Sequence, residues 1–144
     1  MTEHKKNVVA SVLARLRNVA REGGHSFNDV LQSYVIERFL ARLTQSPEAD
    51  TVLLKGALML RVWGVPRARP TMDIDVLRRG AADRDALAAI VRKCASMIDE
   101  SDGVTFDADD MSIDTIHEAG GYIGTRIRVP ARLENVRQVV QIDF

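Results

Sequence analysis

Two aspartates alternate with apolar residues in the short run Met72–Leu77, and this alternation limits the folds open to the chain. Successive side chains of a β-strand point to opposite faces, so Asp73 and Asp75 share one face while the apolar residues share the other. Aspartate is a poor strand former, and two like charges on one face repel each other. The alternation of side chains still predicts a strand here, with one buried apolar face and one charged face.

The rest of the chain predicts an α+β fold, a mixed sheet flanked by helices, with two helices first. Its 144 residues fit one domain, 1–144. We expect helices in the ranges 8–22, 26–43 (with Ser26 as the N-cap), 57–63 and 83–98. We expect strands in the ranges 51–55, 72–77, 104–106, 113–116, 122–129 and 136–144, with a turn at Arg132–Asn135 between the last two.

A third carboxylate comes from the last predicted strand, where Gln141 and Asp143 share a face. Together with Asp73 and Asp75 it would complete a three-carboxylate cluster. Hard oxygen ligands without nearby His or Cys favour Mg²⁺ or Mn²⁺ over Zn²⁺. Such a cluster can hold metal ions against a nucleoside triphosphate. A solvated strand face for the aspartate pair, and an edge-strand position for Asp143, are the simpler alternatives.

A second candidate feature is the segment Lys55-Gly56-Ala57, where a strand runs through a glycine directly into a helix. Free backbone N–H groups at a helix start attract phosphate, and glycine lets the phosphate come close. Lys55 adds a positive charge. An ordinary strand–helix turn has the same sequence pattern. The four arginines at 67, 69, 78 and 79 bracket the aspartate strand and are either phosphate contacts or solvated loop residues.

The net charge, the single cysteine and the length of the apolar runs limit what the protein binds and where it is found. Twenty basic residues balance twenty acidic ones, so any contact with nucleic acid needs a local basic patch. The single cysteine, Cys94, lies in a helical pattern and is expected to be buried and inert. No apolar run approaches a membrane span and the N-terminus lacks a signal-peptide pattern, so we expect a cytoplasmic protein.

The order of these segments resembles a known family. Leu53–Leu60, Trp63 and Arg69–Leu77, followed by Gly121–Arg132 and Gln141–Phe144, are similar to the AbiEii/AbiGii toxin nucleotidyltransferases of the DNA polymerase β-like superfamily. The resemblance spans nearly the whole chain from about residue 27.

This resemblance implies Mg²⁺-dependent transfer of a nucleoside monophosphate from an NTP to an acceptor, with a tRNA end as the expected acceptor. Asp73, Asp75 and Asp143 would be the catalytic metal ligands. Lys55, Gly56, Ala57, Arg69 and Thr71 would bind the nucleotide. It also implies a cognate antitoxin protein as partner.

The chain departs from the family pattern in two ways. Gly56-Ala57 stands where many relatives carry Gly-Gly or Gly-Ser, so a hydroxyl contact to phosphate is lost. Relatives are commonly about twice as long and continue with a helical half that helps to complete the active site. A non-catalytic binding or assembly module, self-associating through an exposed edge at the last strand, is therefore a second hypothesis. A transferase acting on a small molecule is a third.

Overall fold

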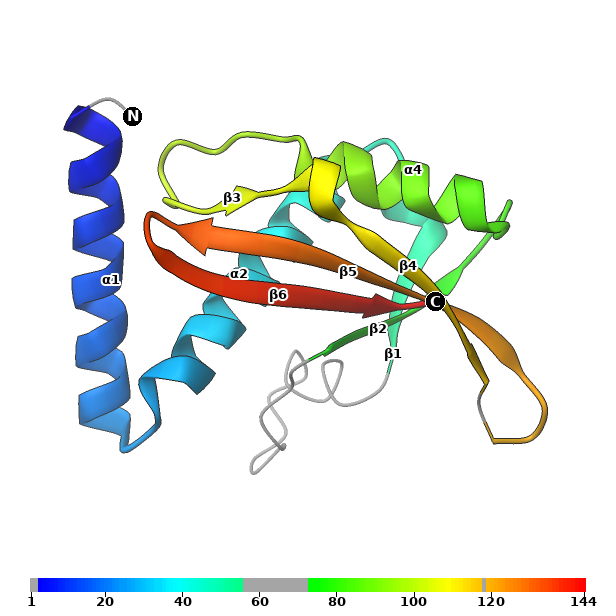
Figure 1. Cartoon of the computed structure of the whole chain (residues 1–144), viewed down its shortest axis with the longest axis horizontal. Helices are drawn as coiled ribbons and strands as arrows, with labels where there is room; N and C mark the ends of the chain where they lie inside the picture. The colour runs from blue at the N-terminus through cyan, green and yellow to red at the C-terminus, as the bar shows by residue number, and fades with distance from the viewer. Residues whose placement is uncertain (1–2, 56–72, 118) are drawn as a thin grey trace.

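The computed structural model describes residues 3–55, 73–117 and 119–144 (Figure 1). Over these ranges the chain forms three helices and a mixed six-stranded sheet, so the predicted α+β class is confirmed. The expected helix at 57–63 and the candidate residues Gly56, Ala57, Arg69 and Thr71 lie outside them. The elements are α1 (Glu3–Gly23), α2 (Phe27–Gln45), η1 (Ala49–Thr51), β1 (Val52–Lys55), β2 (Asp73–Arg78), α4 (Arg84–Ala95), β3 (Thr105–Phe106), η2 (Ala108–Asp110), β4 (Ser112–His117), β5 (Ile123–Leu133) and β6 (Val136–Asp143).

The sheet has the strand order β1-β2-β6-β5-β3, and β4 pairs with β5 on the same side as β3. Strands β2 and β6 run parallel, and the other pairs are antiparallel. Because β6 is paired on both sides, the expectation of an exposed edge at the last strand is wrong. A central position instead gives the residues of β6 neighbours on both sides.

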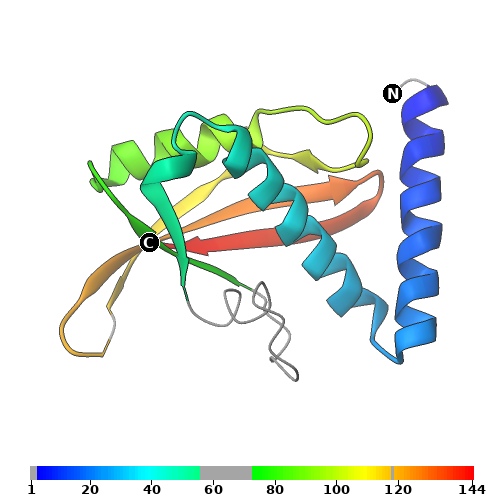
Figure 2. The ribbon, with the colours of Figure 1, turned by 180° about the vertical axis from the view of Figure 1, so that it is seen from behind.

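Helices cover one face of this sheet. Figures 1 and 2 show α2 and α4 packed against it, with α1 standing beside the turn that joins β5 and β6. Ile74 and Val76 of β2 are fully buried on the covered face, as the alternation predicts. Cys94 of α4 is also fully buried, and burial raises the pKa of its thiol. No helix within the described ranges is long and apolar enough to cross a membrane.

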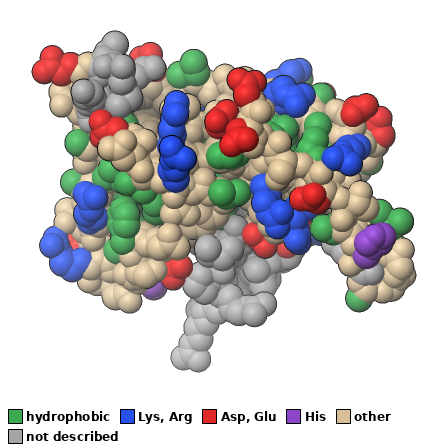
Figure 3. Space-filling model, in the orientation of Figure 1, with side chains coloured by type: hydrophobic (Ala, Val, Ile, Leu, Met, Phe, Trp, Pro, Cys, Tyr) green, Lys and Arg blue, Asp and Glu red, His purple; other side chains and the backbone are tan. Residues whose placement is uncertain are grey.

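The opposite face carries the charged side chains. It is turned to the viewer in Figure 3, where basic and acidic groups lie side by side over the strands. We call it the open face. It holds the aspartates of β2 together with alternate residues of β5 and β6, because each of those strands buries its other set of side chains. Asp114 of β4 lies on the same face as the register partner of Arg126.

The start of α2 and the end of α4 have different local causes. Ser26 caps α2 as predicted, because its Oγ accepts a hydrogen bond of 3.1 Å from the backbone N–H of Asp29. Helix α4 ends at Ala95, three residues before the predicted end, and Ile98 is 80% exposed instead of facing inward. The loop after α4 turns away from the helical path because polar groups of α2 bind it.

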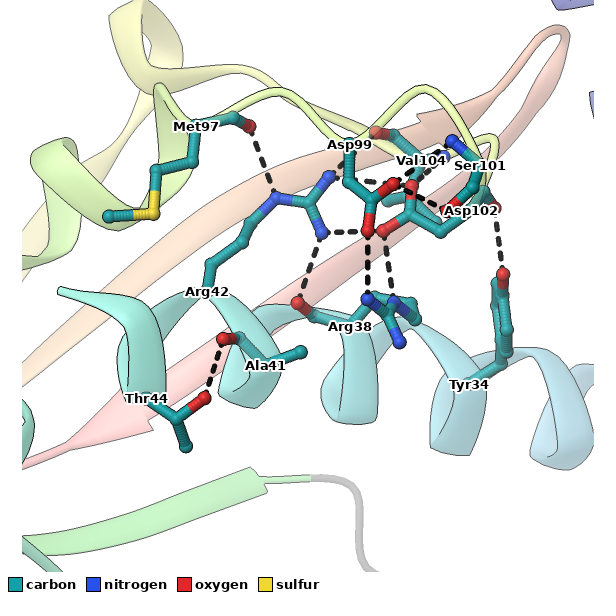
Figure 4. Close-up of polar contacts among 10 residues, drawn as sticks. All are labelled: Tyr34, Arg38, Ala41, Arg42, Thr44, Met97, Asp99, Ser101, Asp102 and Val104. Atoms are coloured by element: carbon teal, nitrogen blue, oxygen red, sulfur yellow. Dashed lines mark hydrogen bonds and ion pairs between the residues drawn. The ribbon is translucent and has the colours of Figure 1, made fainter.

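Three side chains one helical turn apart on α2 make that clamp (Figure 4). The buried Arg42 pairs with the buried Asp102 at 2.7 Å and donates to the carbonyl of Met97 at 3.1 Å. Arg38 Nε contacts the same Asp102 carboxylate at 2.9 Å, and the Tyr34 hydroxyl donates to its backbone carbonyl at 2.7 Å. The clamp therefore ties α2 to the segment leading into β3, and the helical periodicity of α2 did not predict a buried arginine.

Strand β5 is longer than predicted because it passes through a proline. The strand continues through Pro130 to Leu133, so the turn contracts from the expected Arg132–Asn135 to two residues, with Glu134 at φ 57°. Pro130 lies between the residues of β5 that pair with β3 and those that pair with β4, so no strand there needs its missing N–H. Its carbonyl still accepts from the Asp107 N–H at 2.8 Å.

Candidate functional site

A row of charged residues crosses the open face, one from each of five strands. Lys55 of β1 is the register partner of Asp75 of β2, and Asp75 lies beside Asp143 of β6. Asp143 is in turn opposite Arg126 of β5, which is opposite Asp114 of β4. Strand pairing alone therefore brings together residues that lie up to 88 positions apart, since Lys55 and Asp143 flank the same aspartate.

A second row lies one step along the same face. Asp73 is the register partner of Gln141, and Gln141 is the partner of Arg128. The Arg128 Nε donates to Gln141 Oε1 at 3.0 Å, and its Nη1 lies 3.3 Å from a carboxylate oxygen of Asp114. Arg128 therefore links the two rows. The face is an array in which arginines of β5 stand against carboxylates of β2, β4 and β6.

Arg126 and Asp143 form a two-point pair within the array. Arg126 Nε lies 2.9 Å from Asp143 Oδ1, and Nη2 lies 3.0 Å from Oδ2. Asp143 is 7% exposed, so its charge depends on this partner for compensation. The same hydrogen bonds raise the pKa of Arg126. Arg126 thus fixes the orientation of the predicted third carboxylate.

Ionisation of Asp73 on β2 carries an electrostatic cost. Burial raises the pKa of Asp73, and the negative charges of Asp143 and Asp75 raise it further, against a lowering influence from Arg126 and Arg128. Like charges gathered on one face destabilise the ionised form, and a bound cation relieves that cost. The site therefore has the electrostatic character of one that accepts a positive partner.

The oxygen donors of the open face suit a divalent cation. Asp73, Asp75 and Asp143 supply carboxylate oxygens on one face of two neighbouring parallel strands, a donor set suited to Mg²⁺ or Mn²⁺. As the side chains stand, Asp143 turns both oxygens to Arg126. Among the described residues no three Asp, Glu, His or Cys side chains converge as a ligand set. The donor chemistry fits the ion, while Arg126 supplies the positive charge in the arrangement seen.

The predicted nucleotide-binding residues divide into three groups. Lys55 lies on the open face opposite Asp75, within the charged row. Gly56, Ala57, Arg69 and Thr71 fall outside the described residues, so their roles stay predictions. Arg78 does not contact the site, because it lies on the helix-covered side, pairs with Glu48 at 3.1 Å and also hydrogen-bonds Thr51.

The sequence-based prediction missed the arginines of β5 as members of the site. Arg126 and Arg128 alternate with apolar residues, and that alternation placed them on the face away from Ile127 and Val129, as the structure shows. Their partners on β6 depend on the turn. A two-residue turn at 134–135 gives the observed pairing of Arg126 with Asp143, whereas a four-residue turn at 132–135 gives a pairing with Gln141.

The fold and the charged face define a class of α+β protein whose mixed sheet sets three aspartates of two neighbouring parallel strands on one open face. Comparison with protein families assigns the particular family. The model described as "Nucleotidyl transferase AbiEii toxin, Type IV TA system" matches residues 38–144. The match begins within α2 and includes every strand of the part of the chain that the structure describes, and the chain belongs to this family. The family confirms the resemblance seen in the sequence. Comparison with curated proteins gave no match.

Proposed function

We propose that this protein transfers a nucleoside monophosphate from an NTP to an acceptor hydroxyl, as the toxin of a toxin–antitoxin pair. The observation that supports this most directly is the pairing of β2 with β6, which sets Asp73, Asp75 and Asp143 on one face. Membership of a nucleotidyltransferase toxin family makes nucleotidyl transfer the class of reaction and an antitoxin the implied partner.

In this proposal the three aspartates would hold Mg²⁺ or Mn²⁺ together with the triphosphate. The metal ion would neutralise charge on the reacting phosphates. The chain itself supplies positive groups on both sides of the carboxylates, Lys55 on β1 and Arg126 with Arg128 on β5. These cations are placed to orient phosphate oxygens, since guanidinium groups bind them at two points. The acceptor hydroxyl gives up its proton to solvent as its oxygen attacks the α-phosphorus. The bond from that phosphorus to the β-phosphate oxygen breaks, and pyrophosphate leaves with its electron pair.

The acceptor we favour is an RNA end, with tRNA as the first to test. The chain has no net charge, so binding of RNA depends on local cations. The open face provides them, because β5 and β6 carry four arginines at alternate positions there: Arg126, Arg128, Arg132 and Arg137. Arg132 and Arg137 make no ion pair with any described residue, and a transferase acting on a small acceptor needs no free cations at that distance from the aspartates.

The experiment is to incubate the protein with Mg²⁺, each α-labelled NTP in turn and total tRNA, and to follow label entering RNA on a denaturing gel. We expect label with the wild type and loss of about 10²-fold or more in Asp73→Ala or Asp75→Ala, since each removes a metal ligand. Asp85→Asn, on the exposed side of α4, is the matched control and keeps activity. Equal labelling by wild type and Asp73→Ala would refute the proposal.

A further inference from the structure

A pair of arginines faces each other at the far end of the open face. Arg132 of β5 and Arg137 of β6 are direct register partners, and both are exposed. Neither makes an ion pair or a side-chain hydrogen bond with any residue that the structure describes. Like charges directly opposite on neighbouring strands destabilise a sheet. An anion between the two guanidinium groups would remove that cost.

The pair borders a hollow large enough for a small ligand. The hollow has a volume of about 330 Å³ and lies between β3, η2, β5 and β6. Thr105, the register partner of Arg132, adds a hydroxyl at its wall. A volume of this size is near the lower end for sites that hold drug-sized molecules, which suits one nucleotide.

The remaining lining residues suit the other parts of a nucleotide. Pro130 and Val139 are register partners beside the arginines, and Val139 is 48% exposed, so they offer an apolar surface for a base. Asp110 lies at the rim and is exposed, and a carboxylate there accepts hydrogen bonds from ribose hydroxyls. Asp107 instead caps its own turn, because its Oδ1 accepts from the Asp109 N–H at 3.2 Å.

The hollow and the carboxylates share one face. From Arg126 to Arg132 is six residues along β5, which is about 20 Å in an extended strand. A single-stranded chain that runs along β5 with its end at Asp143 would therefore pass over the hollow a few nucleotides back from that end. Arg128 lies between the two places on the same face.

We propose that the hollow seats one nucleotide of a single-stranded RNA acceptor, with its phosphate between Arg132 and Arg137 and its ribose toward Asp110. This inference rests on the proposed function, because it takes the acceptor to be RNA. A ribose 2′-hydroxyl is the group that separates RNA from DNA at such a site. The site therefore favours RNA over DNA of the same sequence.

The test measures binding by fluorescence anisotropy of a labelled twelve-nucleotide single-stranded RNA at several salt concentrations. We expect the double variant Arg132→Ala with Arg137→Ala to bind at least about 10-fold more weakly and to lower the salt slope by about 0.7, the value for the one phosphate that the two arginines share. The matched control, Arg92→Ala with Lys93→Ala on α4, removes the same charge and keeps the affinity. Asp110→Ala is expected to narrow the preference for RNA over the matching DNA.

Three results would overturn the inference: unchanged RNA affinity in the double variant, equal loss in the control, or equally tight binding of a polyglutamate peptide, which would mark a surface for an acidic protein. In the variant Arg137→Glu the new carboxylate attracts Arg132 instead of repelling it, so β5 and β6 stay paired. This variant tests RNA binding without a loss of folding. Nucleotidyl transfer is assayed separately. RNA binding that depends on the two arginines, without transfer, supports the inference and refutes the proposed function. Transfer with an unchanged acceptor KM in the double variant supports the proposed function and refutes the inference.

Discussion

Arg126 and Asp143 face each other across the pairing of β5 and β6, joined by contacts of 2.9 and 3.0 Å. The pair stands where the aspartates of β2 meet the central strand. The guanidinium group thus balances a carboxylate that the proposed reaction needs for a metal ion. Competition between Arg126 and a cation for Asp143 follows from this geometry and can be measured.

Removal of that arginine is expected to destabilise the protein and to increase its response to metal. Arg126→Ala leaves Asp143 nearly buried without its partner, at a cost of about 1–3 kcal/mol given that the arginine is partly exposed. Millimolar Mn²⁺ should then raise the melting temperature of the variant more than that of the wild type. Thermal unfolding with and without Mn²⁺ measures both effects. No extra gain in Arg126→Ala would mean that Asp143 does not bind the ion.

Neutralising Asp73 is expected to stabilise the fold at neutral pH. Burial, then the charges of Asp143 and Asp75, raise the pKa of Asp73 in the folded protein. Its protonated form therefore favours the folded state. This stabilisation is present below the ordinary aspartate pKa of about 4 and is lost as the pH rises through the raised pKa of the folded state. Asp73→Asn should therefore melt a few degrees higher than wild type at pH 7, about 2–5 °C. The difference should shrink below about pH 4. Asp109→Asn, exposed in η2, is the control and should show no such gain.

The clamp of α2 is expected to carry much of the stability. Asp102→Asn leaves the buried Arg42 without its counterion, which costs about 3–5 kcal/mol. Asp99→Asn breaks a more exposed pair with Arg38 and should cost less than about 1 kcal/mol. Urea unfolding of the two variants gives the comparison. Similar midpoints would show that burial of the Arg42 pair adds nothing.

A glycine beside the site is expected to tolerate no side chain. A Cβ on Gly124 would lie 2.7 Å from the carbonyl oxygen of Phe144 and 3.1 Å from the side chain of Ile116. That carbonyl accepts from the Thr125 N–H next to Asp143, so Gly124→Ala should part β5 from the end of β6 and cost about 1–3 kcal/mol. Thr115→Ala on β4 is the control, because it removes atoms without a clash. Urea unfolding that leaves Gly124→Ala as stable as wild type would contradict the expectation.

Local sequence determined much of the fold. Side-chain alternation fixed which residues of β2, β5 and β6 face the helices, because a strand turns every second residue to the same side. Capping chemistry located the start of α2 at Ser26. The same alternation put Asp73 with Asp75, and Gln141 with Asp143, on common faces. The clustering of the three aspartates then required that β2 and β6 be neighbours, which the family resemblance implied and strand pairing bears out.

Tertiary structure decided the partners of these residues. The sequence placed Asp143 on a strand with an exposed edge, yet β6 is central and Asp143 is held by Arg126. One reason is that moving the centre of the β5–β6 turn by one residue changes the cross-strand partner of every residue by two positions. Local sequence patterns do not locate the turn that closely. The other is that Arg42 and Asp102 are 60 residues apart, and no local pattern marks them as a pair. Strand faces follow from the sequence because they are local, whereas charge pairing depends on register and packing across the whole sheet.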